Sequence, residues 1–127
     1  DALSARPDTL AAFYPVVSMD PAIAHAVSRE KLLGPAPDAT RAALYSPERK
    51  VRADMPPLFL LHAEDDDVVQ AGNSLRLHDA AREIGVSCEA HYFAEGGHGF
   101  GLMKTAGLPV AVWPELFWNW LAAQKII

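Results

Sequence analysis

The stretch PPLFLLHAEDDDVV, residues 56–69, joins a short apolar run to an acidic turn. The run Leu58–Leu61 contains no polar side chain, which is typical of a strand that is covered on both faces in a parallel sheet. The turn that follows carries three consecutive aspartates, Asp65, Asp66 and Asp67. We therefore expect a buried strand whose carboxyl end presents a carboxylate.

The chain before this strand predicts a first strand and a helical connection. Residues 10–18 (LAAFYPVVS) form another apolar run, in which Pro15 should lie near the end because proline cannot donate to a strand ladder. Residues 20–57 are rich in proline and indicate short helices and turns. Ser28–Gly34 fits one helix, with Ser28 as N-cap, and Asp38–Leu44 fits another.

The chain after it continues the same alternation. Residues 73–84 place apolar side chains on one helical face, and Gly85 should end that helix. Residues 86–93 alternate in polarity, as in a strand near a sheet edge, and residues 112–123 form a last amphipathic helix. The order predicts an α/β fold, a βαβαβα unit with three parallel strands and flanking helices.

A second loop, GGHGFGL at residues 96–102, places His98 among glycines directly after the last predicted strand. Reactive groups of parallel sheets lie past the carboxyl ends of the strands, so the loops that hold Asp65 and His98 should meet at one edge. A carboxylate there can accept the imidazole N–H and fix the tautomer that exposes the other nitrogen. The two loops together predict the acid and the histidine of a catalytic triad.

The choice among the three aspartates is less direct. We expect Asp65 to be the acid because it begins a D-x-x-V spacing with Val68. Asp66 is the alternative, and Asp67 should face solvent. Taken alone, the acidic run could equally be a solvated turn, and a lone loop histidine is more often inert. Their placement after two successive buried strands favours the functional interpretation.

Composition narrows the classes of partner. The 127 residues allow one domain, and the formal net charge of −5 argues against a nucleic-acid partner or an anionic membrane surface. No apolar stretch reaches the roughly 18 residues of a membrane helix. Cys88 is the single cysteine and should be a packed core residue rather than a nucleophile. The histidines show no metal-ligand spacing, so we expect neither a metal nor an organic cofactor.

Several stretches together resemble the C-terminal half of an α/β-hydrolase, most closely the acetyl-xylan-esterase-like carboxylesterases. They are FYPVVSM (13–19), REKLLGP (29–35), YSPERKV (45–51), PPLFLLHAEDDDVV (56–69), NSLRLHDAAREIGV (73–86) and HYFAEGGHGFGL (91–102). The resemblance implies that Asp65 and His98 are triad members. Gln70 departs from it, because the family usually has proline there. The family's nucleophile elbow, G-x-S-x-G, and its glycine-rich oxyanion loop do not occur in this sequence.

By this resemblance, residues 1–127 are the C-terminal part of a single α/β-hydrolase domain, and the N-terminal half of the sheet lies outside the chain. Residues 1–8 (DALSARPD) would be the exit of the nucleophile helix, and residues 20–55 would form part of the active-site rim. The partners implied are that N-terminal half and a small-molecule ester.

The function implied is that of a serine carboxylesterase for short acyl esters, including acetyl groups on carbohydrate. This chain would supply the acid and the histidine, the serine would lie elsewhere, and the isolated chain should be inactive. Two alternatives stay open: a prolyl-oligopeptidase-like serine peptidase on the same fold, and a non-catalytic fragment that serves as a binding or assembly module.

Overall fold

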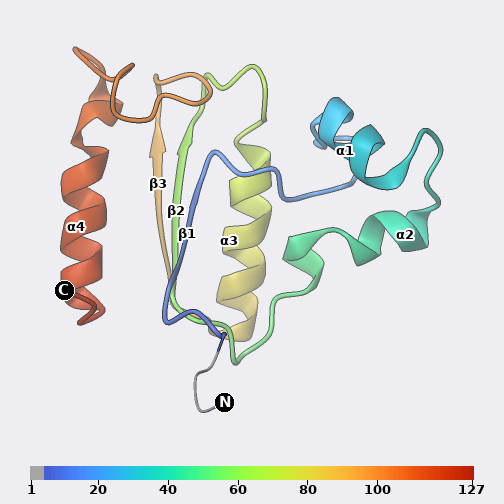
Figure 1. Ribbon diagram of the computed structural model, residues 1–127, viewed down its shortest axis with the longest axis horizontal. Helices are drawn as coiled ribbons and strands as arrows, with labels where there is room; N and C mark the ends of the chain where they lie inside the picture. Colours follow the sequence, from blue (N-terminus) through green and yellow to red (C-terminus); the bar gives the residue numbers. More distant parts are fainter. Residues whose placement is uncertain (1–4) are drawn as a thin grey trace.

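A parallel sheet lies between helices on both of its faces in the computed structural model, which describes residues 5–127 (Figure 1). Its strands, in spatial order, are β1 (Leu10–Phe13), β2 (Leu58–Ala63) and β3 (Cys88–Phe93). The α-helices are α1 (Ala26–Leu33), α2 (Ala39–Leu44), α3 (Gly72–Ile84) and α4 (Trp113–Ala123), and the 3-10 helices are η1 (Pro47–Arg49) and η2 (Pro109–Val112). The predicted α/β class, with three parallel strands and flanking helices, is confirmed.

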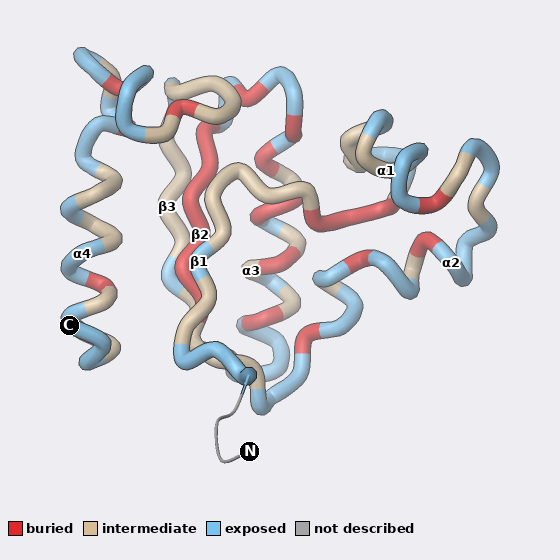
Figure 2. The backbone as a smooth tube through the Cα atoms, in the orientation of Figure 1, coloured by how far each residue is buried: buried red, intermediate tan, exposed pale blue. Residues whose placement is uncertain are grey.

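The central strand β2 is buried along its whole length (Figure 2). Its side chains alternate between two cores: Leu58 and Leu60 face α3, whereas Phe59 and Leu61 face α4. Burying a side chain of this size contributes about 1.5–3 kcal/mol. Apolar residues at every position of the run therefore fix β2 in the middle of the sheet. The ends of β2 and of its neighbour β3 position the loops that follow these two strands.

Strand β1 is shorter than the apolar run that predicted it. It ends at Phe13 because Tyr14 adopts a positive φ of 41° and the next residue, Pro15, has no N–H to donate. The backbone nitrogen of Tyr14 still donates to the carbonyl oxygen of Leu61 at 2.7 Å. Tyr14 is therefore held at the carboxyl end of the sheet although it lies beyond the strand.

The connection from β1 to β2 contains the short helices that its composition predicts. Asp38 caps α2, and its carboxylate accepts the backbone N–H of Arg41 at 2.7 Å. Gly34 ends α1 with a φ of 86°, as expected. The prediction that Ser28 caps α1 is wrong, because the helix begins earlier and His25 is its N-cap. The Nδ1 atom of His25 lies 2.8 Å from the Ser28 hydroxyl oxygen.

The second half of the chain follows the predicted order closely. Helix α3 ends at Gly85 in the left-handed conformation, with a φ of 81°. Strand β3 begins at Cys88, two residues after the expected start, and Pro114 lies in the first turn of α4. No helix in the described part of the chain is long and apolar enough to cross a membrane. Of the expected helix exit at residues 1–8, positions 1–4 lie outside the described residues, and positions 5–8 form no helix.

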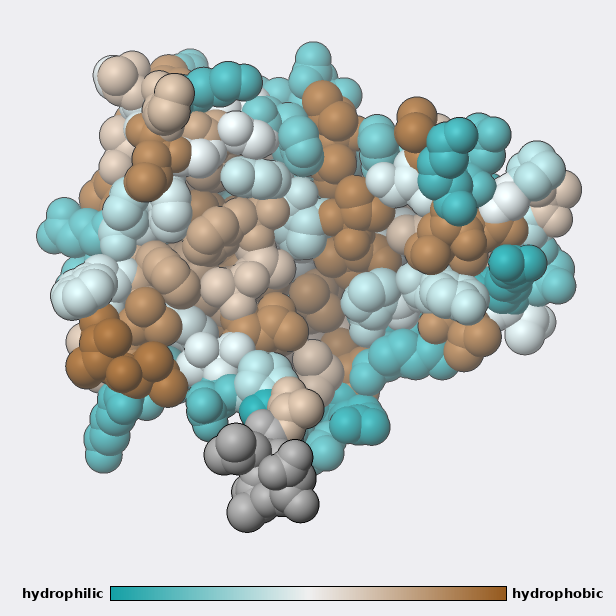
Figure 3. All heavy atoms as spheres, viewed as in Figure 1, coloured by the Kyte–Doolittle hydropathy of each residue, from teal (hydrophilic) through white to brown (hydrophobic). Residues whose placement is uncertain are grey.

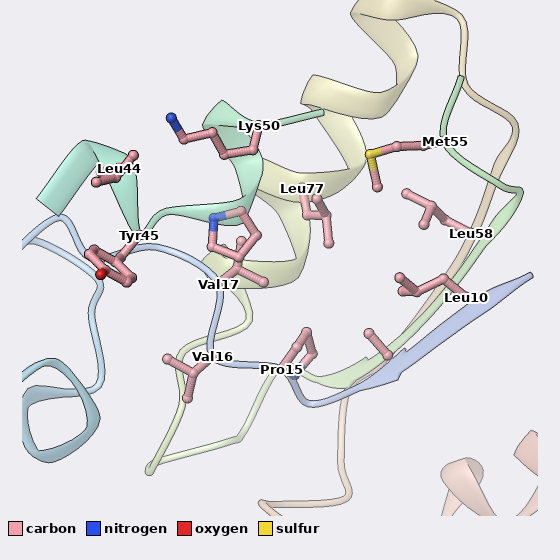
Figure 4. Close-up of a pocket in the computed structure, with 12 residues that line it drawn as sticks. Leu10, Pro15, Val16, Val17, Leu44, Tyr45, Lys50, Met55, Leu58 and Leu77 are labelled. Atoms are coloured by element: carbon pink, nitrogen blue, oxygen red, sulfur yellow. The ribbon is translucent and has the colours of Figure 1, made fainter. Parts of the chain in front are cut away.

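The outer edge of β1 has no neighbouring strand within residues 5–127. Beside it, between the sheet, α3 and the α2–η1 segment, lies an apolar hollow of about 530 Å³ (Figure 4). It is lined by Leu10, Ala12, Pro15, Val16, Val17, Leu44, Tyr45, Pro47, Lys50, Met55, Leu58 and Leu77. Figure 3 shows hydrophobic residues gathered on this face between the sheet and the arm that carries α1 and α2. The sheet edge and the hollow together form an uncovered apolar flank.

Candidate active site

Two loops meet at the carboxyl edge of the sheet. One follows β2 and carries the three aspartates, and the other follows β3 and carries His98; both lie at the top of Figure 1. The parallel register, which pairs Leu61 with His91 and Ala63 with Phe93, brings the two strand ends level. The predicted meeting of these loops is therefore confirmed, although the carboxylate that reaches the imidazole is not the expected one.

His98 is hydrogen-bonded to Asp66. Its Nδ1 atom lies 2.8 Å from the Oδ2 atom of Asp66, whose side chain is fully buried, whereas 32% of the His98 side chain is exposed. Because the aspartate occupies Nδ1, Nε2 is the ring nitrogen left for proton exchange with a substrate or a nucleophile. This is the arrangement by which a triad acid orients its histidine.

The prediction that Asp65 contacts His98 is wrong. Asp65 is exposed, and its Oδ1 atom accepts the backbone N–H groups of Gly96 and Gly97 at 2.9 and 2.7 Å. It thus fixes the loop that bears His98 without touching the ring. The D-x-x-V spacing does not distinguish the two aspartates, because Asp65 has this spacing to Val68 and Asp66 has the same spacing to Val69. Asp67 faces solvent, as expected.

Asp66 uses both carboxylate oxygens. Oδ1 accepts the backbone N–H groups of Val68 and Val69 at 3.0 and 2.8 Å. Oδ2 is shared by His98 and by the Nε2 atom of His62, at 3.2 Å. Burial by itself would raise the pKa of Asp66, but the hydrogen bonds from Val69, His98 and Val68 outweigh it and lower the pKa below its ordinary value of 3.8. The carboxylate is therefore held as an anion beside the imidazole.

Aromatic side chains surround the His98 loop. The ring of Tyr14 meets the His98 ring edge-on, with centroids 5.1 Å apart, and contacts Phe100 in the same way at 5.0 Å. The indole N–H of Trp113 donates to the carbonyl oxygen of Gly101 at 2.8 Å. A wall of packed rings and a fixed loop backbone therefore hold the imidazole above the sheet edge.

Within residues 5–127, no serine is hydrogen-bonded to His98. The imidazole bonds to Asp66 instead, and Ser18, Ser46 and Ser74 are buried. Burial raises the pKa of the Cys88 thiol to about 11, so this group stays protonated near neutral pH. Within residues 5–127, no group of three or more His, Cys, Asp or Glu side chains could hold a metal ion.

One polar side chain next to the site was not anticipated. His62 lies inside β2 and is fully buried, in contact with Asp66 at one ring nitrogen and with Ser74 at the other. The sequence does carry a signal for it, because a histidine in an otherwise apolar buried strand must find hydrogen-bond partners. From the sequence, we consider His62 only among the histidines that could bind a metal.

Comparison with known families agrees with this arrangement. The family model described as "Prolyl oligopeptidase family" matches residues 13–123, which include the last residue of β1, the whole of β2 and β3, and both loops of the site. The chain belongs to the prolyl oligopeptidase family.

Among proteins of known structure, the chain resembles an acetyl ester-xyloside bifunctional hydrolase from Caldicellulosiruptor lactoaceticus, with 37% identity and a TM-score of 0.90. It also resembles a sugar hydrolase from Lactococcus lactis, with 30% identity and a TM-score of 0.74. The two matches cover 96% and 94% of this chain, but only 44% and 49% of the solved chains. The α/β-hydrolase fold expected from the sequence is therefore confirmed.

A curated relative points in the same direction. An acetylxylan esterase of Xylanibacter ruminicola is 34% identical over 100 residues, which is 76% of this chain and 21% of the relative. The resemblance to acetyl esterases stated above is thus confirmed. The chain spans about a fifth of that relative and less than half of the solved structures.

Proposed function

We propose that this chain supplies the acid and the histidine of a serine carboxylesterase that acts on short acyl esters. The observation that carries the proposal is the 2.8 Å hydrogen bond between Nδ1 of His98 and the buried carboxylate of Asp66, at the carboxyl edge of a parallel sheet. Asp66 takes the role that the sequence analysis gave to Asp65. His98 keeps its expected role as general base and acid.

The chemistry follows from the free nitrogen of His98. A serine contributed by the rest of the enzyme gives its proton to Nε2 and attacks the ester carbonyl carbon. The C–O bond to the alcohol then breaks, and His98 returns the proton to the departing oxygen. Water repeats the two steps on the acyl-serine and releases the acid. Asp66 stays ionised throughout and stabilises the imidazolium that forms in each half-reaction.

The rest of the fold supplies what this chain lacks. The open edge of β1 and the adjacent apolar hollow provide a surface on which the N-terminal half of the same enzyme could continue the sheet. The nucleophile and the oxyanion donors would come from that half. Residues 20–55 would form part of the rim. The backbone that leads into this segment is fixed by Asn73, whose side-chain oxygen accepts the backbone N–H groups of Val17 and Ser18 at 3.0 and 2.9 Å.

The choice of esters rests on the relatives. One is named an acetylxylan esterase, and another is named an acetyl ester-xyloside hydrolase. Acetyl groups on carbohydrate are therefore the first substrate class to test. The peptidase alternative has one observation in its favour, because the family model is named for an oligopeptidase. The third alternative, a non-catalytic binding module, predicts no hydrolysis of either bond type.

The experiment compares two leaving groups in an enzyme that contains this chain joined to the rest of the fold. We expect rapid hydrolysis of 4-nitrophenyl acetate and of acetylated xylan, and little cleavage of a proline-containing peptide anilide. The His98→Ala variant should lose at least about a thousandfold in kcat while it keeps its circular dichroism spectrum. Faster cleavage of the anilide would favour the peptidase, and inactivity on both substrates would favour the binding module. Ester hydrolysis by the isolated 127 residues would contradict the placement of the serine outside this chain.

A further inference from the structure

The buried imidazole of His62 lies directly behind the acid of the proposed triad. Its Nε2 atom lies 2.8 Å from the carbonyl oxygen of Val69 and 3.2 Å from Oδ2 of Asp66. Its Nδ1 atom lies 2.8 Å from the hydroxyl oxygen of Ser74, at the start of α3. The ring of His62, which β2 carries, therefore links this strand to the acidic turn and to α3.

The partners determine which ring nitrogen carries the hydrogen. A backbone carbonyl oxygen can only accept, so the Nε2 atom that faces Val69 must be a donor. The same hydrogen points toward Oδ2 of Asp66, which is also only an acceptor while it is ionised. In the neutral ring, Nδ1 then accepts the hydroxyl hydrogen of Ser74. This arrangement satisfies both nitrogens of a side chain that has no access to solvent.

We propose that His62 is a positioning residue for the acid of the catalytic pair: its Nε2–H holds the carboxylate of Asp66 against His98. The inference rests on the function proposed above, because it assigns His62 a role through Asp66. The Oδ2 atom is the oxygen that both histidines share. Without the N–H donor at Nε2, Oδ2 of Asp66 would lose its hydrogen bond to His62 and keep only the one to His98. The turn would also lose its bond at the Val69 carbonyl.

Two amide substitutions separate the two ends of the ring. The amide of glutamine can place an N–H near the position of Nε2, whereas the shorter amide of asparagine reaches only the position of Nδ1. In the enzyme that contains the complete fold, His62→Gln should keep kcat within about threefold. His62→Asn should lower kcat by about tenfold or more with little change in KM, because a misplaced catalytic group slows the chemical step more than binding.

Ser74→Ala is the matched control for a purely structural role. It removes the partner at Nδ1 and leaves the Nε2 contacts in place, so it should lower Tm but keep kcat within about threefold. Equal losses of kcat in His62→Asn and His62→Gln, or a kcat unchanged in both, would overturn the proposal. So would a loss of kcat in Ser74→Ala as large as that in His62→Asn.

Nitrogen-15 NMR of the unmodified enzyme tests the geometry without any variant and without activity. We expect a hydrogen on Nε2 of His62 and none on Nδ1, together with a low-field Nδ1–H resonance from His98. The opposite tautomer of His62 would overturn the proposal even if the enzyme is an active esterase. Should His62→Asn fail to fold, the tautomer and His62→Gln still decide. If the unmodified enzyme has no esterase activity, the proposed function fails, and the NMR result alone decides whether His62 holds Asp66.

Discussion

Asp65 and Asp66 are adjacent in sequence but hold different parts of the same loop. Oδ2 of Asp66 lies 2.8 Å from the ring of His98, whereas Oδ1 of Asp65 lies 2.7 Å from the backbone nitrogen of Gly97. The buried carboxylate orients the ring, and the exposed one anchors the backbone that carries it. The acidic turn thus has a structural and a chemical member, and five predictions test this arrangement and its surroundings.

The first concerns acid stability. Because the pKa of Asp66 is lowered below 3.8 in the folded state, its anionic form contributes stability that is complete above the unfolded pKa and disappears as the pH falls through the folded value. Asp66→Asn should therefore cost about 1–3 kcal/mol in the free energy of unfolding at pH 7, and less as the pH falls below about 4. Denaturant titrations across this range measure the difference. Asp67→Asn, at an exposed position, is the control, and a cost at Asp66 that does not change with pH would contradict the assignment.

The second concerns the space at Gly96. A Cβ there would lie 3.0 Å from Cβ of Ala63 and 3.2 Å from Cδ1 of Phe100, which is tighter than most packed Cβ contacts and requires these neighbours to shift by a few tenths of an ångström. Gly96→Ala should therefore destabilise the protein by about 1–3 kcal/mol and displace His98. Gly72→Ala is the matched control, because its nearest atom would be 3.9 Å away. Thermal unfolding of both variants measures the loss of stability. Equal Tm values would contradict the prediction, because they would show that a Cβ fits at position 96.

The third concerns the aromatic wall. Tyr14 packs edge-on against both His98 and Phe100, and such ring contacts contribute about 0.5–1.5 kcal/mol each beyond their burial. In the enzyme with the complete fold, Tyr14→Ala should lower kcat severalfold because the imidazole loses its lateral support. Tyr14→Phe keeps both ring contacts and should retain most of the activity. Steady-state kinetics with a nitrophenyl ester distinguish the two, and an equal loss of activity in Tyr14→Ala and Tyr14→Phe would show that the hydroxyl, not the ring, matters.

The fourth concerns the uncovered flank. The free edge of β1 and the apolar hollow lined by Leu10, Leu44 and Leu77 should make the isolated chain associate or precipitate. Light scattering after size-exclusion chromatography measures this. A monodisperse monomer with a cooperative melting transition would contradict the idea that this flank is normally covered.

Much of the fold could be predicted from the sequence, because side-chain periodicity reports burial directly. The all-apolar run Leu58–Leu61 marks a strand with cores on both faces, and Gly85 marks the end of the following helix. The end of β1 could not be predicted to the residue. The apolar run continues past Phe13, and Pro15 indicates only that the strand ends near it. The positive φ of Tyr14, which ends the strand at Phe13, has no signal in the sequence.

The sequence predicts which two loops form the site, but it does not predict which carboxylate contacts His98. Periodicity and strand order place the acidic turn beside His98, whereas the direction of each carboxylate depends on how a tight turn folds. Oδ1 of Asp66 accepts the N–H groups of Val68 and Val69, which turns Asp66 inward and leaves Asp65 facing the glycine loop. Local hydrogen bonds of this kind leave no periodic trace in a sequence.

The most direct test of the account is the kcat of two asparagine variants in an enzyme that contains this chain within the complete fold, measured with 4-nitrophenyl acetate. Asp66→Asn should lower kcat by about a thousandfold or more, because His98 would lose its orienting anion. Asp65→Asn, which alters only the anchor on Gly96 and Gly97, should lower it by no more than about tenfold. A severe loss in Asp65→Asn with near-normal turnover in Asp66→Asn would contradict the assignment of Asp66 as the triad acid.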